Sequence, residues 1–253
     1  MIVLKNPQQL AAMKEAGAMT ADALLVAGKA IEQGITSAEI DSIVHNYIVK
    51  QGGIPSCLHY NGFPASTCIS VNNAVIHGIP GGYKIKKGDI VSVDLCVLYR
   101  GWQGDSAATF PCGEISLQAQ KLIDATRESM FMGIAAAKAG ARLGDVGHAV
   151  QQYVEDRGFS VVRQFVGHGI GKEMHEEPDV PNYGKPGHGL RLVPGMVITV
   201  EPMINEGGAA VKTMPDGWTV KTRDDKLSAH FENTIAITED GPVILTVPTR
   251  EKQ

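Results

Sequence analysis

The sequence has 253 residues, of which 43% are hydrophobic and 20% charged, and its formal net charge is −4. This composition is ordinary for a folded globular protein and gives no bulk signal for nucleic acid or an anionic membrane as partner. The start, MIVLKNPQQL, lacks the apolar stretch of a signal peptide, and no apolar run approaches membrane-spanning length. The four cysteines show neither CxxC nor zinc-ribbon spacing, which predicts reduced thiols in a cytoplasmic protein.

Four helices are predicted, most of them from a capping signal. Asn6-Pro7 starts the first, which runs toward Gly34, and the capping box Thr36–Glu39 starts the second. Ser116 caps the third, and residues 144–157 form the fourth. Extended segments are expected at 68–71, 76–77, 91–110, 160–166, 197–204, 209–213, 218–222 and 233–237. Because no linker or low-complexity segment separates these elements, we predict a single domain over residues 1–253.

Residues 91–110, VSVDLCVLYRGWQGDSAATF, predict a β-hairpin with two carboxylates. A turn centred between Tyr99 and Arg100 would place Asp94 directly opposite Asp105, with Cβ atoms roughly 5 Å apart. Like charges so close are destabilising unless they share a proton or a cation. A register shifted by one residue would instead turn one of the two aspartates to solvent.

The chain also carries signs of an internal repeat. The predicted order is ααββ followed by ααββ, which divides the chain at approximately 1–115 and 116–253. Two separate alignments support the division at offsets of 106 and 107 residues, the first between helix pairs and the second between strands (Gly34 with Gly140 and Tyr47 with Tyr153; Gly88 with Gly195 and Val93 with Val200). The repeat places Glu201 at the position equivalent to Asp94, so a pseudo-two-fold fold would bring both carboxylates to a central site.

Three further residues extend this candidate site. His168 lies between glycines in FVGHGIG, which permit a tight backbone around an unobstructed imidazole. Glu201 ends an apolar strand, and Glu232 begins another in HFENTIAIT. A charge in such a strand is costly unless it is paired or bound to metal. Each residue taken alone is better explained as an ordinary strand-end charge or a core histidine with satisfied hydrogen bonds than as a ligand. No GxGxxG or GxxxxGK[ST] sequence is present, so a phosphate loop is rejected.

Taken together, the motifs VSVD-x10-D, GHGIG, TVEPM and HFENT resemble those of the type I methionine aminopeptidases, of the short bacterial kind. The resemblance covers essentially the whole chain. It implies an α/β (α+β) pita-bread fold, in which two pseudo-symmetric ααββ halves surround a central antiparallel sheet, in accord with the repeat.

The resemblance also implies a dinuclear metal site. Asp94 would chelate one ion, His168 and Glu201 would hold the other, and Asp105 and Glu232 would bridge them. This oxygen-rich set suits two divalent cations such as Co²⁺, Mn²⁺, Fe²⁺ or Zn²⁺ and is too rich in carboxylates for structural zinc.

The implied reaction is removal of the initiator methionine from nascent polypeptides, with preference for a small second residue. Glu201 matches the family's proton shuttle, His77 the histidine near the new amine, and His175 the one that hydrogen-bonds the scissile carbonyl. Without the family's flanking residues, both histidines would be interpreted as solvent-facing or capping. The other histidines match no catalytic motif and are interpreted as structural or surface residues: His45, His59, His148, His188 and His230.

An apolar pocket for the methionine side chain is implied as well. Its family positions fall on Cys57, Tyr60, Phe63, Cys68, Met174 and Trp218. Phe63 stands where many relatives carry tyrosine, and Met174 where many carry phenylalanine, so the shape of the pocket is in question. A monovalent cation site for Na⁺ or K⁺ is implied at Asn72, Ala74 and Ser228. The family further implies a monomer. Action on nascent chains would favour association with the ribosome, although no segment of the sequence indicates a ribosome-binding surface.

Three alternatives remain open at this stage. The first is a proline-specific peptidase of the prolidase or aminopeptidase P kind, which usually has an additional N-terminal domain. The second is a non-catalytic relative that binds polypeptides or ribosomes and has lost metal ligands. The third is a metal-binding or storage protein, for which His77, His175 and an apolar pocket would have no use.

Overall fold

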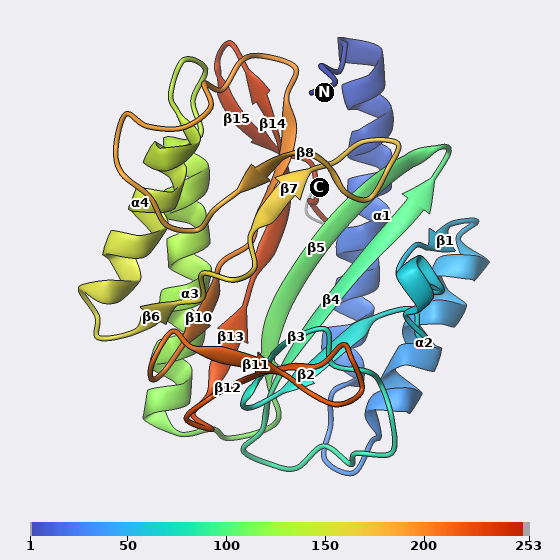
Figure 1. Cartoon of the computed structure of the whole chain (residues 1–253). Coiled ribbons are helices and arrows are strands. Elements are labelled where there is room, and N and C mark those ends of the chain that lie inside the picture. The colour runs from blue at the N-terminus through green and yellow to red at the C-terminus, as the bar shows by residue number, and fades with distance from the viewer. Residues whose placement is uncertain (1, 250–253) are drawn as a thin grey trace.

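The computed structural model describes residues 2–249; residue 1 and residues 250–253, with which the predicted domain begins and ends, lie outside the described part. Figure 1 shows a mixed α/β fold with four long helices and a strongly curved antiparallel sheet. The helices are α1 (Pro7–Ala30), α2 (Ser37–Lys50), α3 (Leu117–Ala136) and α4 (Leu143–Glu155), and a short 3₁₀ turn, η1, spans Tyr60–Gly62.

The helix starts follow the capping chemistry of the sequence. The Asn6 side chain accepts a hydrogen bond from the Gln9 amide, and the Gln9 side chain accepts one from the Asn6 amide. These two bonds form a capping box, and Pro7 occupies the first helical position. Thr36 and Glu39 form the same box at α2. Ser116 caps α3 through the Ala119 amide. The four predicted helices are therefore confirmed, with ends displaced by a few residues.

The main sheet has nine strands. Seven of them follow the order β1-β4-β5-β14-β9-β7-β8, with β2 paired to β4 and β15 to β14. Their bounds are β1 (Ile54–Pro55), β2 (Cys68–Val71), β4 (Ile90–Tyr99), β5 (Trp102–Pro111), β7 (Gly167–Gly169), β8 (Glu176–Val180), β9 (Val197–Val200), β14 (Glu232–Thr238) and β15 (Gly241–Ile244).

Two three-stranded sheets complete the fold, with the orders β13-β10-β6 and β11-β12-β3. These strands are β3 (Ala74–Ile76), β6 (Ser160–Val161), β10 (Met203–Asn205), β11 (Val211–Thr213), β12 (Val220–Thr222) and β13 (Ser228–His230). The predicted strand 197–204 is split into β9 and β10, since neither Glu201 nor Pro202 belongs to a strand. The predicted strand 160–166 shrinks to the two residues of β6.

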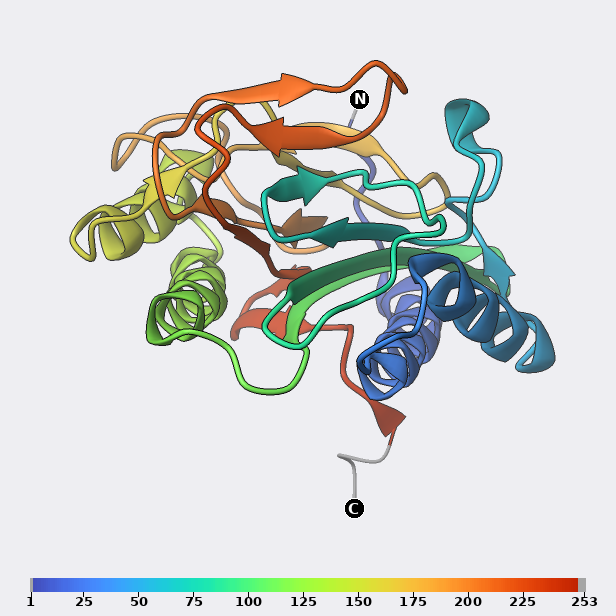
Figure 2. The same ribbon diagram turned by 90° about the horizontal axis from the view of Figure 1, so that it is seen from below.

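The two halves of the chain meet in the middle of the main sheet, where β5 pairs with β14 through Glu232 opposite Ala107 and Asn233 opposite Ser106. Figure 2 shows the pairs α1–α2 and α3–α4 beside the sheet on its outer side, with β3, β11 and β12 across the sheet from them. Each helix pair has its own apolar core. Ile40 and Val44 of α2 belong to a buried cluster with Val93 of β4, and α3 and α4 share one with β9 and β14. This arrangement leaves the inner face of the sheet free to form a site.

None of the helices within residues 2–249 has both the length and the apolar character needed to cross a membrane.

Candidate active site

A cavity of about 590 Å³ opens on the inner face of the sheet, next to the β5–β14 junction. It brings together side chains that are far apart in the sequence. Every residue predicted for the metal site or the substrate pocket lines it: Cys57, Tyr60, Phe63, Cys68, His77, Asp94, Asp105, His168, Met174, His175, Glu201, Trp218 and Glu232.

The register of the β4–β5 hairpin differs from the prediction. Asp94 lies opposite Ala107, and Asp105 lies opposite Cys96, so the two aspartates are diagonal neighbours. The turn consists of Arg100 and Gly101, whose φ angles of 51° and 81° correspond to a type I′ turn, the type whose twist matches a hairpin. The observed pairing is shifted by two residues from the predicted one, because Asp94 faces residue 107 and not residue 105. Side chains along a strand alternate between its two faces, so a shift of two residues leaves both aspartates on the same face.

Asp105 and Glu232 lie at the bottom of the cavity, where the two halves meet. Their side chains come from the adjacent strands β5 and β14 and are 5% and 3% exposed. Thr234 fixes the backbone of Asp105 with hydrogen bonds of 3.1 and 2.8 Å, and Ser106 donates to the Glu232 carbonyl. Asp105 Oδ1 and Glu232 Oε1 nevertheless have no hydrogen-bond partner within the described residues. Two orphaned carboxylate oxygens in a buried site fit a bound cation.

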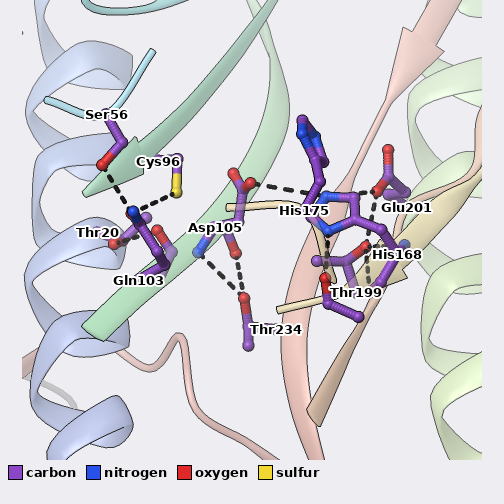
Figure 3. A network of polar contacts seen from close by, with 12 residues as sticks. Thr20, Ser56, Cys96, Gln103, Asp105, His168, His175, Thr199, Glu201 and Thr234 are labelled. Atoms are coloured by element: carbon purple, nitrogen blue, oxygen red, sulfur yellow. Dashed lines mark hydrogen bonds and ion pairs between the residues drawn. The ribbon is translucent and has the colours of Figure 1, made fainter. Parts of the chain in front are cut away.

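His168 completes a triad with these two carboxylates. Ligand atoms of Asp105, His168 and Glu232 all lie within 4.8 Å of one another. His168 Nδ1 is 2.9 Å from the Gly169 carbonyl, which can only accept, so the ring proton sits on Nδ1. The free lone pair is therefore on Nε2, 3.5 Å from Glu201 Oε1 and 3.9 Å from Asp105 Oδ2 (Figure 3). This tautomer is the one that a metal-binding imidazole requires.

Glu201 extends from the end of β9 toward His168 and is fixed at both its side chain and its backbone. The Thr199 hydroxyl donates to Glu201 Oε1 at 2.7 Å and accepts from the His168 amide at 2.9 Å. Asn182, which is buried, donates to the Glu201 carbonyl at 3.0 Å. Thr199 therefore holds Glu201, the candidate proton acceptor, at a fixed distance from His168, a candidate metal ligand.

The electrostatics of the cluster are those of carboxylates without a counter-charge. Burial raises the pKa of Asp94 to about 7. Burial, reinforced by the other carboxylates, raises the pKa values of Asp105, Glu201 and Glu232 well above their usual range. Divalent cations would remove this cost by supplying the missing positive charge. The donor set of four carboxylates and one neutral imidazole thus fits hard divalent ions.

The two predicted catalytic histidines both line the cavity but pack against different rings, His77 against Phe165 and Trp218 and His175 against Tyr60 and His168. His77 follows the end of β3 with a φ of 56°, so it is not part of a strand as its predicted segment 76–77 required. Burial, with a smaller contribution from His175, lowers the pKa of His77 to about 4. His175 Nδ1 is 2.6 Å from the Tyr60 hydroxyl, and the ring packs 4.3 Å from that of His168. Both imidazoles are therefore neutral at neutral pH.

The apolar wall of the cavity is built mainly from aromatic rings. Phe63 and Trp218 meet edge to face with centroids 5.1 Å apart, and Trp218 also lies 6.3 Å from His77. Phe165 packs against His77 at 5.8 Å. Sequence reasoning did not select Phe165, which it assigned to the strand over 160–166; the only signal was its position shortly before His168.

The predicted monovalent cation positions are neighbours in the fold. The Ser228 amide donates to the Asn72 carbonyl at 2.9 Å, and Ala74 lies two residues further along, at the start of β3. Both side chains have protein partners, because Asn72 bonds Asp89 and Ile90 while Ser228 bonds Ile204 and Asn205. An ion here would depend on backbone carbonyls.

One histidine assigned to structure or surface lies directly behind the site, close to Glu201. His230 on β13 is 1% exposed, and its Nε2 is 3.9 Å from Glu201 Oε2. Burial lowers its pKa to about 3. Its sequence context, SAHFENT, contains the motif that carries Glu232, but nothing in that motif indicated that His230 approaches Glu201. His45, by contrast, bonds Ser66 at 2.8 Å and is not among the residues that line the cavity.

Comparison with known proteins gives consistent results at three levels. The model of metallopeptidase family M24 matches residues 11–239. A methionine aminopeptidase of Clostridium perfringens is 53% identical over 247 residues, which cover 98% of this chain and 99% of the relative. The crystal structure of methionine aminopeptidase from Rickettsia prowazekii superposes with a TM-score of 0.96 at 42% identity, covering 98% of this chain and all of that one.

A prolidase from Pyrococcus horikoshii shares the fold, with a TM-score of 0.77 and 24% identity; the match covers 99% of this chain but 65% of that one. These matches confirm the predicted pita-bread fold. The methionine aminopeptidases match over their full length at 42–53% identity, whereas the prolidase is longer and only 24% identical, so the chain is distinguished from the proline-specific peptidases. The chain belongs to metallopeptidase family M24 and, within it, to the methionine aminopeptidases.

Proposed function

We propose that this chain removes the N-terminal initiator methionine from nascent polypeptides, with preference for a small second residue. The observation that supports this most strongly is the meeting of four carboxylates and a neutral imidazole at one end of a cavity whose wall is aromatic. The first group suits hydrolytic metal chemistry, and the second suits a thioether side chain. No storage or binding role would need both.

The chain uses divalent metal ions, as its family and its acidic cluster support. We propose two ions per chain, drawn from Co²⁺, Mn²⁺, Fe²⁺ and Zn²⁺. Asp94 would bind one ion, His168 and Glu201 would bind the other, and Asp105 and Glu232 would lie between them. Bound ions of this kind supply an activated water and polarise a carbonyl oxygen.

Glu201 would take the proton of the attacking water and pass it to the leaving amine. Its Oε1 lies 3.5 Å from His168 Nε2, so the carboxylate is within the candidate metal site, where it can reach a water held there. The Thr199 hydroxyl, 2.7 Å from Oε1, keeps the carboxylate facing His168. The position of the base is therefore fixed before substrate arrives.

His175 and His77 would contact the scissile peptide bond. The pKa of the Tyr60 phenol is raised by burial, so it keeps its proton and can donate to His175 Nδ1. In that arrangement His175 carries its proton on Nε2, where it can hydrogen-bond a carbonyl oxygen on which negative charge develops. His77 would stabilise the new amine from the opposite side, next to Phe165.

The methionine side chain would lie against the aromatic wall, in the pocket formed by Cys57, Tyr60, Phe63, Cys68, Met174 and Trp218. A monovalent ion near Asn72, Ala74 and Ser228 would brace the strands beside this pocket. Monomeric state, action near the ribosome and a cytoplasmic location belong to the same proposal.

The test is hydrolysis of Met-Ala-Ser compared with Ala-Pro-Ala, each with and without added Mn²⁺ or Co²⁺. We expect release of free methionine only when metal is present and no release of alanine from the proline peptide. Failure to cleave Met-Ala-Ser with any divalent metal would contradict the proposal. Faster cleavage of Ala-Pro-Ala would favour a proline-specific peptidase.

A further inference from the structure

His230 lies behind the cavity, among buried residues, and neither of its ring nitrogens has a hydrogen-bond partner among residues 2–249. Buried polar atoms in folded proteins are nearly always paired, because an unpaired donor or acceptor costs stability. An apolar side chain of similar size would avoid this cost. The presence of an imidazole here therefore calls for a functional explanation.

The carboxylate of Glu201, which lies close to the His230 ring, suggests such an explanation. His230 Nε2 lies 3.9 Å from Oε2 of Glu201, whereas Thr199 Oγ1 lies 2.7 Å from Oε1 of the same carboxylate. Thr199 and His230 thus face opposite oxygens of Glu201. A movement of about 0.8 Å would bring Nε2 within ordinary hydrogen-bond distance.

The backbone of His230 is fixed firmly enough to hold the ring in this place. Thr109 on β5 bonds both its amide and its carbonyl, each at 2.9 Å, and Ser92 on β4 bonds Thr109 at 2.8 Å. Met203 on β10 lies directly opposite His230 and is fully buried. All backbone bonding is therefore satisfied by neighbours, and only the ring nitrogens remain available.

His230 does not line the cavity, so it cannot touch a substrate. Whatever it contributes must act through Glu201. We propose that His230 is a positioning residue for Glu201: its ring donates an Nε2–H hydrogen bond to Oε2, and with Thr199 on Oε1 this fixes the orientation of the carboxylate. The inference rests on the proposed function, since it assigns a support to the proposed proton acceptor.

If His230 positions Glu201, an apolar substitution at residue 230 should have a different effect than if the ring only fills space. If the ring only fills space, H230L should be neutral or stabilising and should leave turnover unchanged, because a buried orphan is removed. If the ring orients Glu201, H230L should lower kcat without loss of melting temperature. H230Q keeps a neutral N–H donor and should recover the rate.

The experiment measures kcat and KM on Met-Ala-Ser, Mn²⁺ affinity by calorimetric titration, and melting temperature, for the unchanged enzyme, H230L, H230Q and M203L. M203L is the matched control, because it alters packing opposite His230 without removing a polar atom. We expect kcat of H230L to fall roughly tenfold to a hundredfold, the loss typical of one hydrogen bond to a charged group. We also expect KM and Mn²⁺ affinity within about threefold, and a return of H230Q to within about threefold of the original kcat.

Three outcomes would overturn the inference: an unchanged kcat in H230L, equal losses in H230L and M203L, or a loss of Mn²⁺ affinity that accounts for the lost rate. H230M supplies the same test if H230L does not fold, because methionine adapts to irregular spaces. An unchanged enzyme that is inactive with every metal would overturn the proposed function and this inference with it; activity in that enzyme with no effect of H230L overturns the inference alone.

Discussion

The two halves of the molecule use the same backbone devices to present their carboxylates. Gly34 and Gly140 both have positive φ angles, 98° and 88°, and each donates a hydrogen bond to the loop that precedes its half's main strand. An isolated bridge follows in each half, Thr36 with Lys84 and Arg142 with Arg191. The division of the domain near residue 115 stays a prediction, but these equivalent contacts support it.

The halves differ in what lies between their paired strands. In the first, β4 and β5 are joined by the two-residue turn Arg100-Gly101 and pair over their full length. In the second, residues 201–231, which contain β10 to β13, separate β9 from β14. This inserted segment contributes Trp218 to the cavity and His230 behind it. The repeated backbone thus brings candidate ligands from both halves together, and the unequal connections provide the asymmetric features that a directional reaction needs.

The sharpest contrast lies between the equivalent residues Asp94 and Glu201. Glu201 receives a hydrogen bond from Thr199, whereas no hydrogen bond to the Asp94 side chain is found in residues 2–249. We therefore expect E201Q to lower kcat by about 10³-fold at any metal concentration, because a proton acceptor and a ligand are both lost. D94N should lose only a ligand, so raising the Mn²⁺ concentration should restore part of its rate.

The measurement is kcat on Met-Ala-Ser over a Mn²⁺ titration, with far-UV circular dichroism to establish that both variants fold. Full activity in E201Q would remove its assigned role as proton acceptor. Recovery of E201Q by added metal to the same degree as D94N would show that the two halves are functionally equivalent after all.

His77 and His168 offer a second contrast, since the first belongs to the N-terminal half and the second to the C-terminal half. His168 Nε2 faces the carboxylate cluster, whereas His77 packs against Phe165 and Trp218. We expect H77A to lower kcat about 10²-fold with unchanged metal content, and H168A to lower metal content itself. Metal analysis of the dialysed proteins, together with turnover per bound metal, distinguishes the two. Lost metal with normal turnover per metal in H77A would contradict its role.

The sequence predicted the helices and the faces of the strands better than it predicted register. Capping boxes at Asn6 and Thr36 are local chemistry, so they can be recognised without knowledge of tertiary contacts. The turn at Arg100 was misplaced because a positive φ at arginine has no local sequence signal. Even so, alternation preserved the face of both aspartates, which is why the candidate site survived an error in register.

Two residues near the site were not selected from the sequence, His230 and Phe165. His230 lies near Glu201 because β13 pairs with β10, and this pairing joins segments about 25 residues apart through a strand that the sequence did not predict. Phe165 was placed in a strand, since a single aromatic residue in an apolar run carries no sign of the cavity beside it. Motifs identify groups that bind metal; only the tertiary structure identifies what supports them.

Removing the metal should test how much the contact between the two halves of the chain depends on a bound cation. The β5–β14 junction places Asp105 and Glu232 side by side without a counter-charge, so a bound cation should stabilise the contact between halves. At metal concentrations about 100 times the dissociation constant, linkage gives about 2.7 kcal/mol, or roughly 5–10 °C for a chain of this size. Differential scanning calorimetry with and without a chelator measures this shift. Equal melting temperatures would mean that the junction does not depend on metal.

The smallest expected effects concern the glycines where a helix packs closely in each half. A Cβ at Gly104 of β5 would lie 2.7 Å from the Gly17 amide nitrogen of α1, which is backbone and cannot rotate away. A Cβ at Gly133 of α3 would meet the side chain of Val150 at the same distance, and alanine would favour the helix. We expect G104A to cost about 2 kcal/mol and G133A about 1 kcal/mol or less, measured by urea unfolding of the metal-loaded protein. Equal losses would show that both helix pairs are packed with the same tolerance; a larger loss in G104A would mean that the first half, whose hairpin carries both aspartates, holds its helix more rigidly against the site.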